Sequence, residues 1–190
     1  MSEVKNILLV GVGGQGTILA SKILTSGLIK AGYDVKMSEI HGMSQRGGSV
    51  STQVRYGEKV YSPIVGKGSA DVIVAFEEME ALRWLDHLKI GGKMVINDYR
   101  IQPVPVNLGN AEYPEGIIEH LSGICDVHAF KAAEIATELG NPKAMNIVLL
   151  GALVKAMGLD DIDWDAEIEA NVKAKFIDLN KAAFKAGYNL

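Results

Sequence analysis

Three glycines near the start of the chain have the spacing of a phosphate-binding turn. Gly11, Gly13 and Gly16 form a G-x-G-x-x-G pattern in LLVGVGGQGT, residues 8–17, directly after a short apolar run. Where such a turn joins a strand to a helix, free backbone N–H groups and the positive end of the helix dipole attract an anion. The pattern is typical of dinucleotide binding and hydride transfer, but the spacing alone is a weak signal.

This turn has two competing interpretations. In a fold that binds NAD or FAD, an acidic residue near the end of the second strand meets the ribose hydroxyls, and Glu39 is the candidate. In a purely structural interpretation, the glycines permit a tight turn and close helix–strand packing. That accounts for Gly11 and Gly16, but less well for the polar Gln15 at a helix start.

A second segment, HGMSQRGGSV at 41–50, is polar and rich in glycine. It concentrates Ser44, Gln45 and Arg46, and the guanidinium of Arg46 is a planar donor for carboxylate or phosphate. The alternative is an ordinary solvated loop. We expect His41, at its start, to order the loop rather than to bind a ligand.

Composition excludes several kinds of site on this chain. The single cysteine, Cys125, cannot supply the about four ligands of an iron–sulfur cluster or a multi-cysteine zinc site. The net charge is −4 and no run of lysine or arginine occurs, so we expect no nucleic-acid partner. We find no signal-peptide pattern, and the longest apolar stretch, 146–159, contains Lys155, so we expect a cytoplasmic protein without a membrane span.

Hydrophobic periodicity predicts the elements that must position these segments. The expected strands are residues 6–11, 34–40, 70–76, 93–98 and 127–130. The expected helices are residues 15–32, 77–92, 131–140, 141–158 and 163–187. The acidic start of the second helix is interpreted as a favourable dipole arrangement, formed by Glu77, Glu78 and Glu80.

Alternating polar and apolar residues over 49–65, with a turn at YGEK, predict a hairpin. No second crossover helix is expected between Ile40 and Ala70, and this departs from a dinucleotide-binding half. We predict one domain over residues 1–190. It would be an α/β fold with a three-layer, Rossmann-like open sheet, mostly parallel with an antiparallel hairpin, and helices on both faces.

Several segments together resemble the gamma-type component of 2-oxoacid:ferredoxin oxidoreductases. The segments are GVGGQGT (11–17), EIHGMSQRGGSV (39–50), YSPIV (61–65), ADVIVAFEEMEALR (70–83), YPEGI (113–117) and MNIVLLGAL (145–153). The resemblance spans nearly the whole chain, and its two glycine loops are far more specific in combination than G-x-G-x-x-G alone. Within the family, the likeness is greatest to the small (beta) subunits of the indolepyruvate enzymes.

The resemblance implies an assembly that oxidatively decarboxylates a 2-oxoacid to an acyl-CoA, with CoA as co-substrate and ferredoxin as electron acceptor. It places thiamine diphosphate, Mg²⁺ and [4Fe-4S] clusters on a large catalytic partner subunit, and no catalytic residue, metal or cofactor on this chain. The sequence agrees, since it lacks both a cysteine set and a G-D-G thiamine diphosphate pattern. The implied substrate is indolepyruvate or another aryl pyruvate; pyruvate, 2-oxoglutarate and branched-chain 2-oxoacids are the alternatives.

The candidate ligand- or partner-binding residues all belong to the two loops or to the strand end between them. They are Gly11, Gly13, Gly14, Gln15, Gly16, Glu39, His41, Gly42, Ser44, Gln45, Arg46, Gly47 and Gly48. Both loops are expected at the same edge of the sheet, where ligands of open α/β folds gather. Three roles stay open: lining the interface with the catalytic subunit and its CoA path, binding a nucleotide in a free-standing regulatory module, or a purely structural contact.

Overall fold

The computed structural model describes residues 3–41 and 47–190. It contains a six-stranded sheet with the order β2-β3-β1-β4-β5-β6. The strands are β1 (Lys5–Val12), β2 (Asp34–His41), β3 (Ser49–Gly57), β4 (Ala70–Ala75), β5 (Leu88–Asn97) and β6 (Asp126–Phe130).

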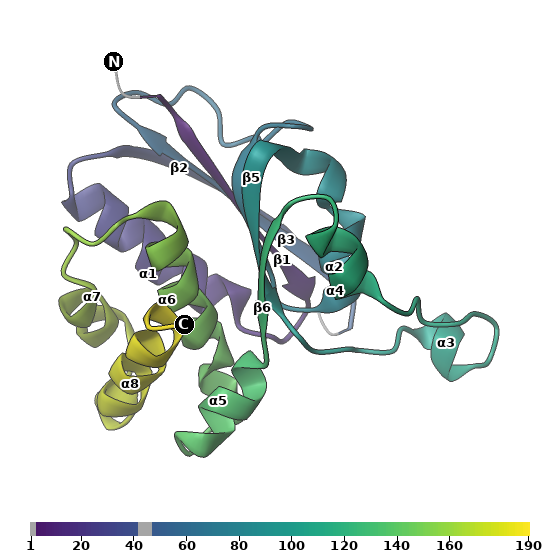
Figure 1. Cartoon of the computed structure of the whole chain (residues 1–190). Coiled ribbons are helices and arrows are strands. Elements are labelled where there is room, and N and C mark those ends of the chain that lie inside the picture. Colours follow the sequence, from purple (N-terminus) through teal and green to yellow (C-terminus); the bar gives the residue numbers. More distant parts are fainter. Residues whose placement is uncertain (1–2, 42–46) are drawn as a thin grey trace.

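Helices cover both faces of this sheet (Figure 1). The α-helices are α1 (Thr17–Lys30), α2 (Glu78–Arg83), α3 (Val104–Asn107), α4 (Ile117–Ser122), α5 (Ala132–Glu138), α6 (Met145–Met157), α7 (Trp164–Asn171) and α8 (Ile177–Tyr188). Three short 3₁₀ turns are η1 (Leu85–His87), η2 (Pro142–Ala144) and η3 (Ala174–Phe176). The predicted α/β class, with a mostly parallel sheet between helical layers, is confirmed.

Alternate residues of each central strand enter two separate cores. Ile7 and Leu9 of β1 face the core beneath α1, α5, α6, α7 and α8, whereas Leu8 and Val10 face the smaller core beneath α2 and α4. This alternation follows from the two-residue period of a strand, and burial of both faces explains why the strand sequences are almost continuously apolar.

The position of β3 corrects the predicted topology. β3 lies between β2 and β1 and runs antiparallel to both, so the hairpin is β2–β3 rather than 49–65. Residues 60–65 form no strand. They are tied to the polar face of β3 instead, since Val65 N–H donates to Gln53 Oε1 at 2.6 Å and Arg55 Nη1 donates to Ser62 O at 3.0 Å. Pro63 adds a second reason, because it has no N–H for a ladder.

Two helix predictions were too long. The helix expected over 77–92 ends at Arg83, and residues from Leu88 onward belong to β5. The helix expected over 163–187 breaks at Val172, whose backbone is extended. The break lets α7 pack against α1 while α8 packs against α6, contacts that one straight helix could not make together.

Helices α6 and α8 pack backbone against backbone. A Cβ added to Gly187 would lie 1.8 Å from Val148 O, and one added to Gly151 would lie 2.1 Å from Phe184 O. Only glycine permits so close an approach of two helices. The pair therefore forms a rigid unit on one face of the sheet (Figure 1).

Candidate functional site

The two glycine segments meet at the carboxyl end of β1. Gly13 N–H donates to Gly48 O at 2.9 Å, and Gly47 N–H donates to Gly13 O at 3.4 Å. Residues 11–16 and 47–49, together with residues 76–80 that follow β4, are called the carboxyl rim below. Tying the turn after β1 to the residues before β3 is possible because β3 is antiparallel and directly beside β1.

Gln15 holds this rim together. Its Oε1 accepts from Val12 N–H at 2.8 Å, and its Nε2 donates to Phe76 O at 2.8 Å. The side chain is only 8% exposed. A polar residue at the helix start is thus explained by a buried two-way hydrogen bond between the ends of β1 and β4, a partnership that no local pattern reveals.

Gly16 begins α1 in a left-handed conformation, with φ 83° and no side-chain cap. Asn146 of α6 donates its Nδ2–H to Gly16 O at 3.0 Å, and a Cβ on Gly16 would lie 2.6 Å from that nitrogen. Gly14, with φ 103°, faces open space. The start of α1 therefore combines an uncapped positive dipole end with room beside Gly14 for a partner.

Three buried carboxylates form the other half of the rim, and they do more than complement a helix dipole. Glu77 accepts from Glu80 N–H at 3.0 Å and from Ile101 N–H at 3.1 Å, and it also accepts from the Tyr113 hydroxyl. Glu80 accepts from Ser49 Oγ at 2.5 Å. The first of these contacts caps α2, and the dipole interpretation missed the others because they join segments far apart in the sequence.

Glu78, the third of these acids, pairs with Arg100 through both carboxylate oxygens at 3.2 and 3.1 Å. Its burial is the larger influence and raises the pKa of the carboxyl above the usual range for glutamate. Burial, followed by the hydrogen bond to Glu77, likewise raises the pKa of the Tyr113 hydroxyl. Tyr113 therefore stays a hydrogen-bond donor to Glu77 throughout the ordinary pH range.

Glu39 does not lie where a dinucleotide fold places its ribose-binding acid. Ser21 Oγ of α1 donates to Glu39 Oε1 at 3.2 Å. Because β3 separates β2 from β1, Glu39 is two strand spacings, about 10 Å, from the strand that carries the glycine turn. In the dinucleotide arrangement these two strands are neighbours.

The second loop is described only in part. The backbone of His41 pairs with Val50 at the end of the β2–β3 ladder. The remaining predicted residues before Gly47 lie outside the described part of the chain: Gly42, Ser44, Gln45 and Arg46.

A cleft of about 470 Å³ opens beside the start of α1. This asparagine cleft is lined by Leu19, Asn141, Lys143, Asn146, Asn171, Lys173, Phe176 and Asn180, among others. Neither Lys143 nor Lys173 has an ion-pair partner among the described residues. Ammonium and amide groups around an apolar floor can bind phosphate and amide groups of a ligand.

The described residues do not offer a metal or cluster site. Within residues 3–41 and 47–190, no three His, Cys, Asp or Glu side chains are grouped to hold an ion. Cys125 Sγ contacts Leu121 O at 3.5 Å, and burial raises the pKa of the thiol, so it is not a thiolate at neutral pH. Among the same residues, no helix has both the length and the apolar character of a membrane span.

Comparison with known proteins agrees with this architecture. A model of the pyruvate ferredoxin/flavodoxin oxidoreductase family matches residues 6–190. The chain is 43% identical over 189 residues to indolepyruvate oxidoreductase subunit IorB of Thermococcus kodakarensis, covering 96% of this chain and 93% of that protein. It is 29% identical over 198 residues to 2-oxoglutarate synthase subunit KorC of Methanothermobacter thermautotrophicus, covering 98% and 94%.

Solved structures show the same fold. The gamma subunit of a keto/oxoacid ferredoxin oxidoreductase from Geobacter sulfurreducens superposes with a TM-score of 0.76 at 23% identity, covering 99% of this chain and 96% of that chain. A 2-oxoglutarate:ferredoxin oxidoreductase from Magnetococcus marinus gives 0.75 at 22% identity, and there the whole of this chain matches 31% of a longer polypeptide. The protein belongs to the pyruvate ferredoxin/flavodoxin oxidoreductase family.

Proposed function

We propose that this chain is the small, non-catalytic subunit of an indolepyruvate:ferredoxin oxidoreductase in the cytoplasm. The observation that carries the proposal is 43% identity to a subunit IorB over nearly the full length of both chains. The complex would decarboxylate an aryl pyruvate oxidatively, form an acyl-CoA and reduce ferredoxin. The KorC likeness at 29% identity makes 2-oxoglutarate the next candidate substrate, ahead of pyruvate and branched-chain 2-oxoacids.

The cofactors of this reaction would lie on the larger partner subunit. One half-buried cysteine cannot ligate a [4Fe-4S] cluster, so this chain does not fit that group. Thiamine diphosphate and Mg²⁺ are assigned to the partner as well, since the sequence lacks the corresponding pattern. The reaction steps therefore belong to the partner, and this chain supplies a surface.

We place that surface at the carboxyl rim. The turn after β1 and the residues before β3 are hydrogen-bonded to each other, so both present backbone groups on one side of the molecule. The asparagine cleft beside the rim carries two lysines and several amides, which suit the phosphates and amides of CoA. The second loop, with Gln45 and Arg46, would meet the catalytic subunit or CoA.

Co-expression with the large subunit tests the function. A stable complex should reduce ferredoxin or viologen with an aryl pyruvate and CoA, whereas this chain alone should not. Faster turnover with 2-oxoglutarate would instead assign the chain to the KorC-type enzymes. A complex that forms but uses no 2-oxoacid would contradict the proposal.

Substitution of Arg46 tests the role of the second glycine-rich loop. We expect Arg46→Ala to lower turnover or raise the KM for CoA by about tenfold, as for loss of one charged hydrogen bond. Lys22→Ala, which changes an exposed lysine on α1, is the matched control and should have no effect. Full activity of Arg46→Ala in an intact complex would leave only a structural role for this loop.

The regulatory alternative has its own test. A free-standing nucleotide-binding module requires micromolar binding of NAD, FAD or ATP by this chain alone. The placement of Glu39 beside α1 and the engagement of Gln15 within the rim speak against it. Titration calorimetry should therefore show no binding heat with these nucleotides.

A further inference from the structure

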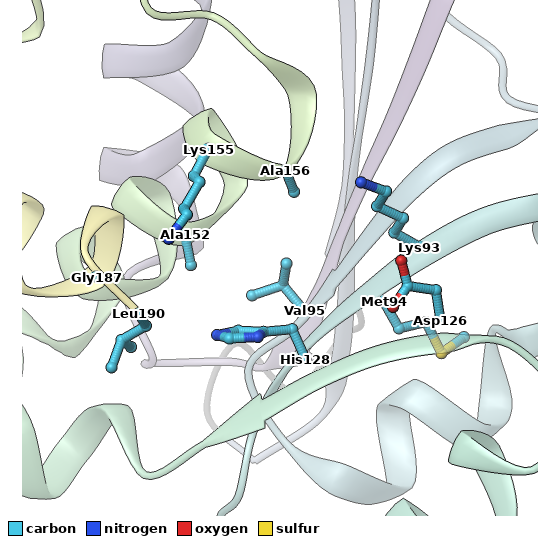
Figure 2. A pocket seen from close by; sticks show the side chains of 10 residues that line it. All are labelled: Lys93, Met94, Val95, Asp126, His128, Ala152, Lys155, Ala156, Gly187 and Leu190. Carbon is cyan, nitrogen blue, oxygen red and sulfur yellow. The ribbon is translucent and has the colours of Figure 1, made fainter.

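A second cavity lies on the helix-covered face of β5 and β6, away from the carboxyl rim. Its volume is about 290 Å³, at the small end of ligand-binding pockets. Val95 and His128 form its floor, because their strands pair in register, and Ala152 and Ala156 of α6 form its wall (Figure 2). The helix side of the cavity is therefore built of small apolar side chains, and the strand side combines an apolar residue with an imidazole.

The shape of this cavity is a consequence of helix packing. Glycine-mediated contact holds α8 against α6, and the cavity lies between this helix pair and the first half of the edge strand β6. The contact with α8 at Gly151 and Gly187 fixes the position of the α6 wall relative to α8. A bound molecule would find this cavity already formed and lose little free energy to reorganisation.

The charged groups around the cavity are arranged asymmetrically. Figure 2 shows Lys155 at one side, Lys93 and Asp126 at the other, and the imidazole of His128 between them. Neither lysine has an ion-pair partner within residues 3–41 and 47–190. The lining side chains thus carry two ammonium groups and one carboxylate, the chain-terminal residue Leu190 adds its α-carboxylate, and His128 adds an N–H donor in either protonation state.

We propose that this cavity binds a small aryl carboxylate that carries a ring N–H. The carboxylate would lie between Lys155 and His128, where charge-assisted hydrogen bonds are available. The flat ring would lie against Val95 and the two alanines of α6, and Asp126 would accept from the ring N–H. Imidazole also packs against aromatic rings, as His128 already does with Phe130, at 5.3 Å between ring centroids and with the rings tilted by 60°.

Nuclear magnetic resonance of the full 190-residue chain tests this site, with indole-3-acetate as the probe. The expected result is saturable shifts of Val95, Ala152 and Ala156 signals. Lys155→Met should weaken binding about tenfold, the usual effect of losing a charged hydrogen-bond partner. Lys22→Met removes an exposed lysine outside the cavity and should leave the affinity unchanged.

Two further ligands separate specific binding from general attraction of anions. Phenylacetate, which lacks the ring N–H, should bind more weakly than indole-3-acetate to the wild-type chain, and Asp126→Ala should abolish that difference. Acetate should cause no saturable shifts. Equal shifts with acetate, or equal losses in Lys155→Met and Lys22→Met, would overturn the proposal. Because binding to this chain is measured directly, the outcome does not depend on whether the complex oxidises indolepyruvate.

Discussion

At the residue scale, the rim is held by polar side chains whose partners are distant in sequence. Gln15 is the clearest case, because its amide joins Val12 N–H to Phe76 O inside the protein. A buried amide of this kind must be both donor and acceptor. The position therefore demands glutamine for hydrogen-bonding reasons, before any role in binding is considered.

Replacing the Gln15 amide tests its two hydrogen bonds between the ends of β1 and β4. Gln15→Glu places a carboxylate oxygen against Phe76 O and buries a charge, so the free energy of unfolding should fall by about 2–4 kcal/mol at neutral pH. Urea denaturation followed by circular dichroism measures the change. A midpoint equal to that of the wild-type chain would show that the side chain can leave the rim without cost.

Glu78 makes the stability depend on pH. Its pKa is raised in the folded chain, mainly by burial. Between the pKa of unfolded Glu78 and that of folded Glu78, the folded state therefore binds more protons than the unfolded state. The stability contributed by protonated Glu78 is therefore lost as pH rises through the folded pKa. Glu78→Gln removes this titration, so the variant should gain stability relative to the wild type as pH rises from about 4.3, the ordinary pKa of glutamate, through the raised pKa of folded Glu78.

Urea midpoints of both proteins at several pH values check the sign of this effect. The Arg100 ion pair is absent in the variant, which shifts its stability by an offset. The informative quantity is therefore the slope of the difference against pH. A flat or opposite slope would mean that Arg100 outweighs burial in the folded protein.

At the scale of elements, two contacts decide the architecture. The antiparallel strand β3 separates β2 from β1 and brings the two glycine segments together. The α6–α8 contact fixes the helical layer and shapes the second cavity. Each depends on residues without bulky side chains at the point of closest approach.

Gly187→Ala tests the helix contact. The added Cβ would lie 1.8 Å from a backbone oxygen, which cannot rotate away, so the helices must separate. We expect a loss of about 3 kcal/mol in the free energy of unfolding, despite the better helix propensity of alanine. Gly66→Ala is the control, since the nearest atom to its Cβ would be Ser69 Oγ at 3.8 Å. Equal stability of the two variants would contradict close packing.

At the scale of the whole molecule, one sheet separates two cores, and each core contains a tryptophan. Trp164 packs with α7 and α8 on one face, and Trp84 packs with α2 on the other. Because the central strands contribute side chains to both cores, we propose that the chain unfolds as one cooperative unit. One cooperative unfolding transition is what we expect of a single domain over residues 1–190.

Single-tryptophan variants report the two faces separately. Trp84→Phe and Trp164→Phe should each show one denaturation transition by fluorescence that coincides with the transition by circular dichroism. Leu121→Ala leaves a cavity beneath α4. It should lower both denaturation midpoints together and reduce the free energy of unfolding by about 2–5 kcal/mol. Separate transitions for the two tryptophans would show that the faces unfold independently.

Local pattern was sufficient for the α/β class and for most strands and helices, and the family came from the resemblance of several segments to known members. Strand and helix periods act over a few neighbouring residues, so they can be read without knowing the fold. The meeting of the glycine turn with Gly48 was also predictable, because the segments around both loops indicate strand ends at one edge.

Only the tertiary structure decided the place of β3, the break after α7 and the partners of Gln15, Glu77 and Glu80. Strand order and buried hydrogen bonds depend on contacts between segments tens of residues apart, and the same local alternation fits a hairpin in either direction. The cavity over β5 and β6 likewise depends on segments that are far apart in the sequence. Its lining combines residues of β5, β6, α6 and α8, which only the tertiary structure brings together.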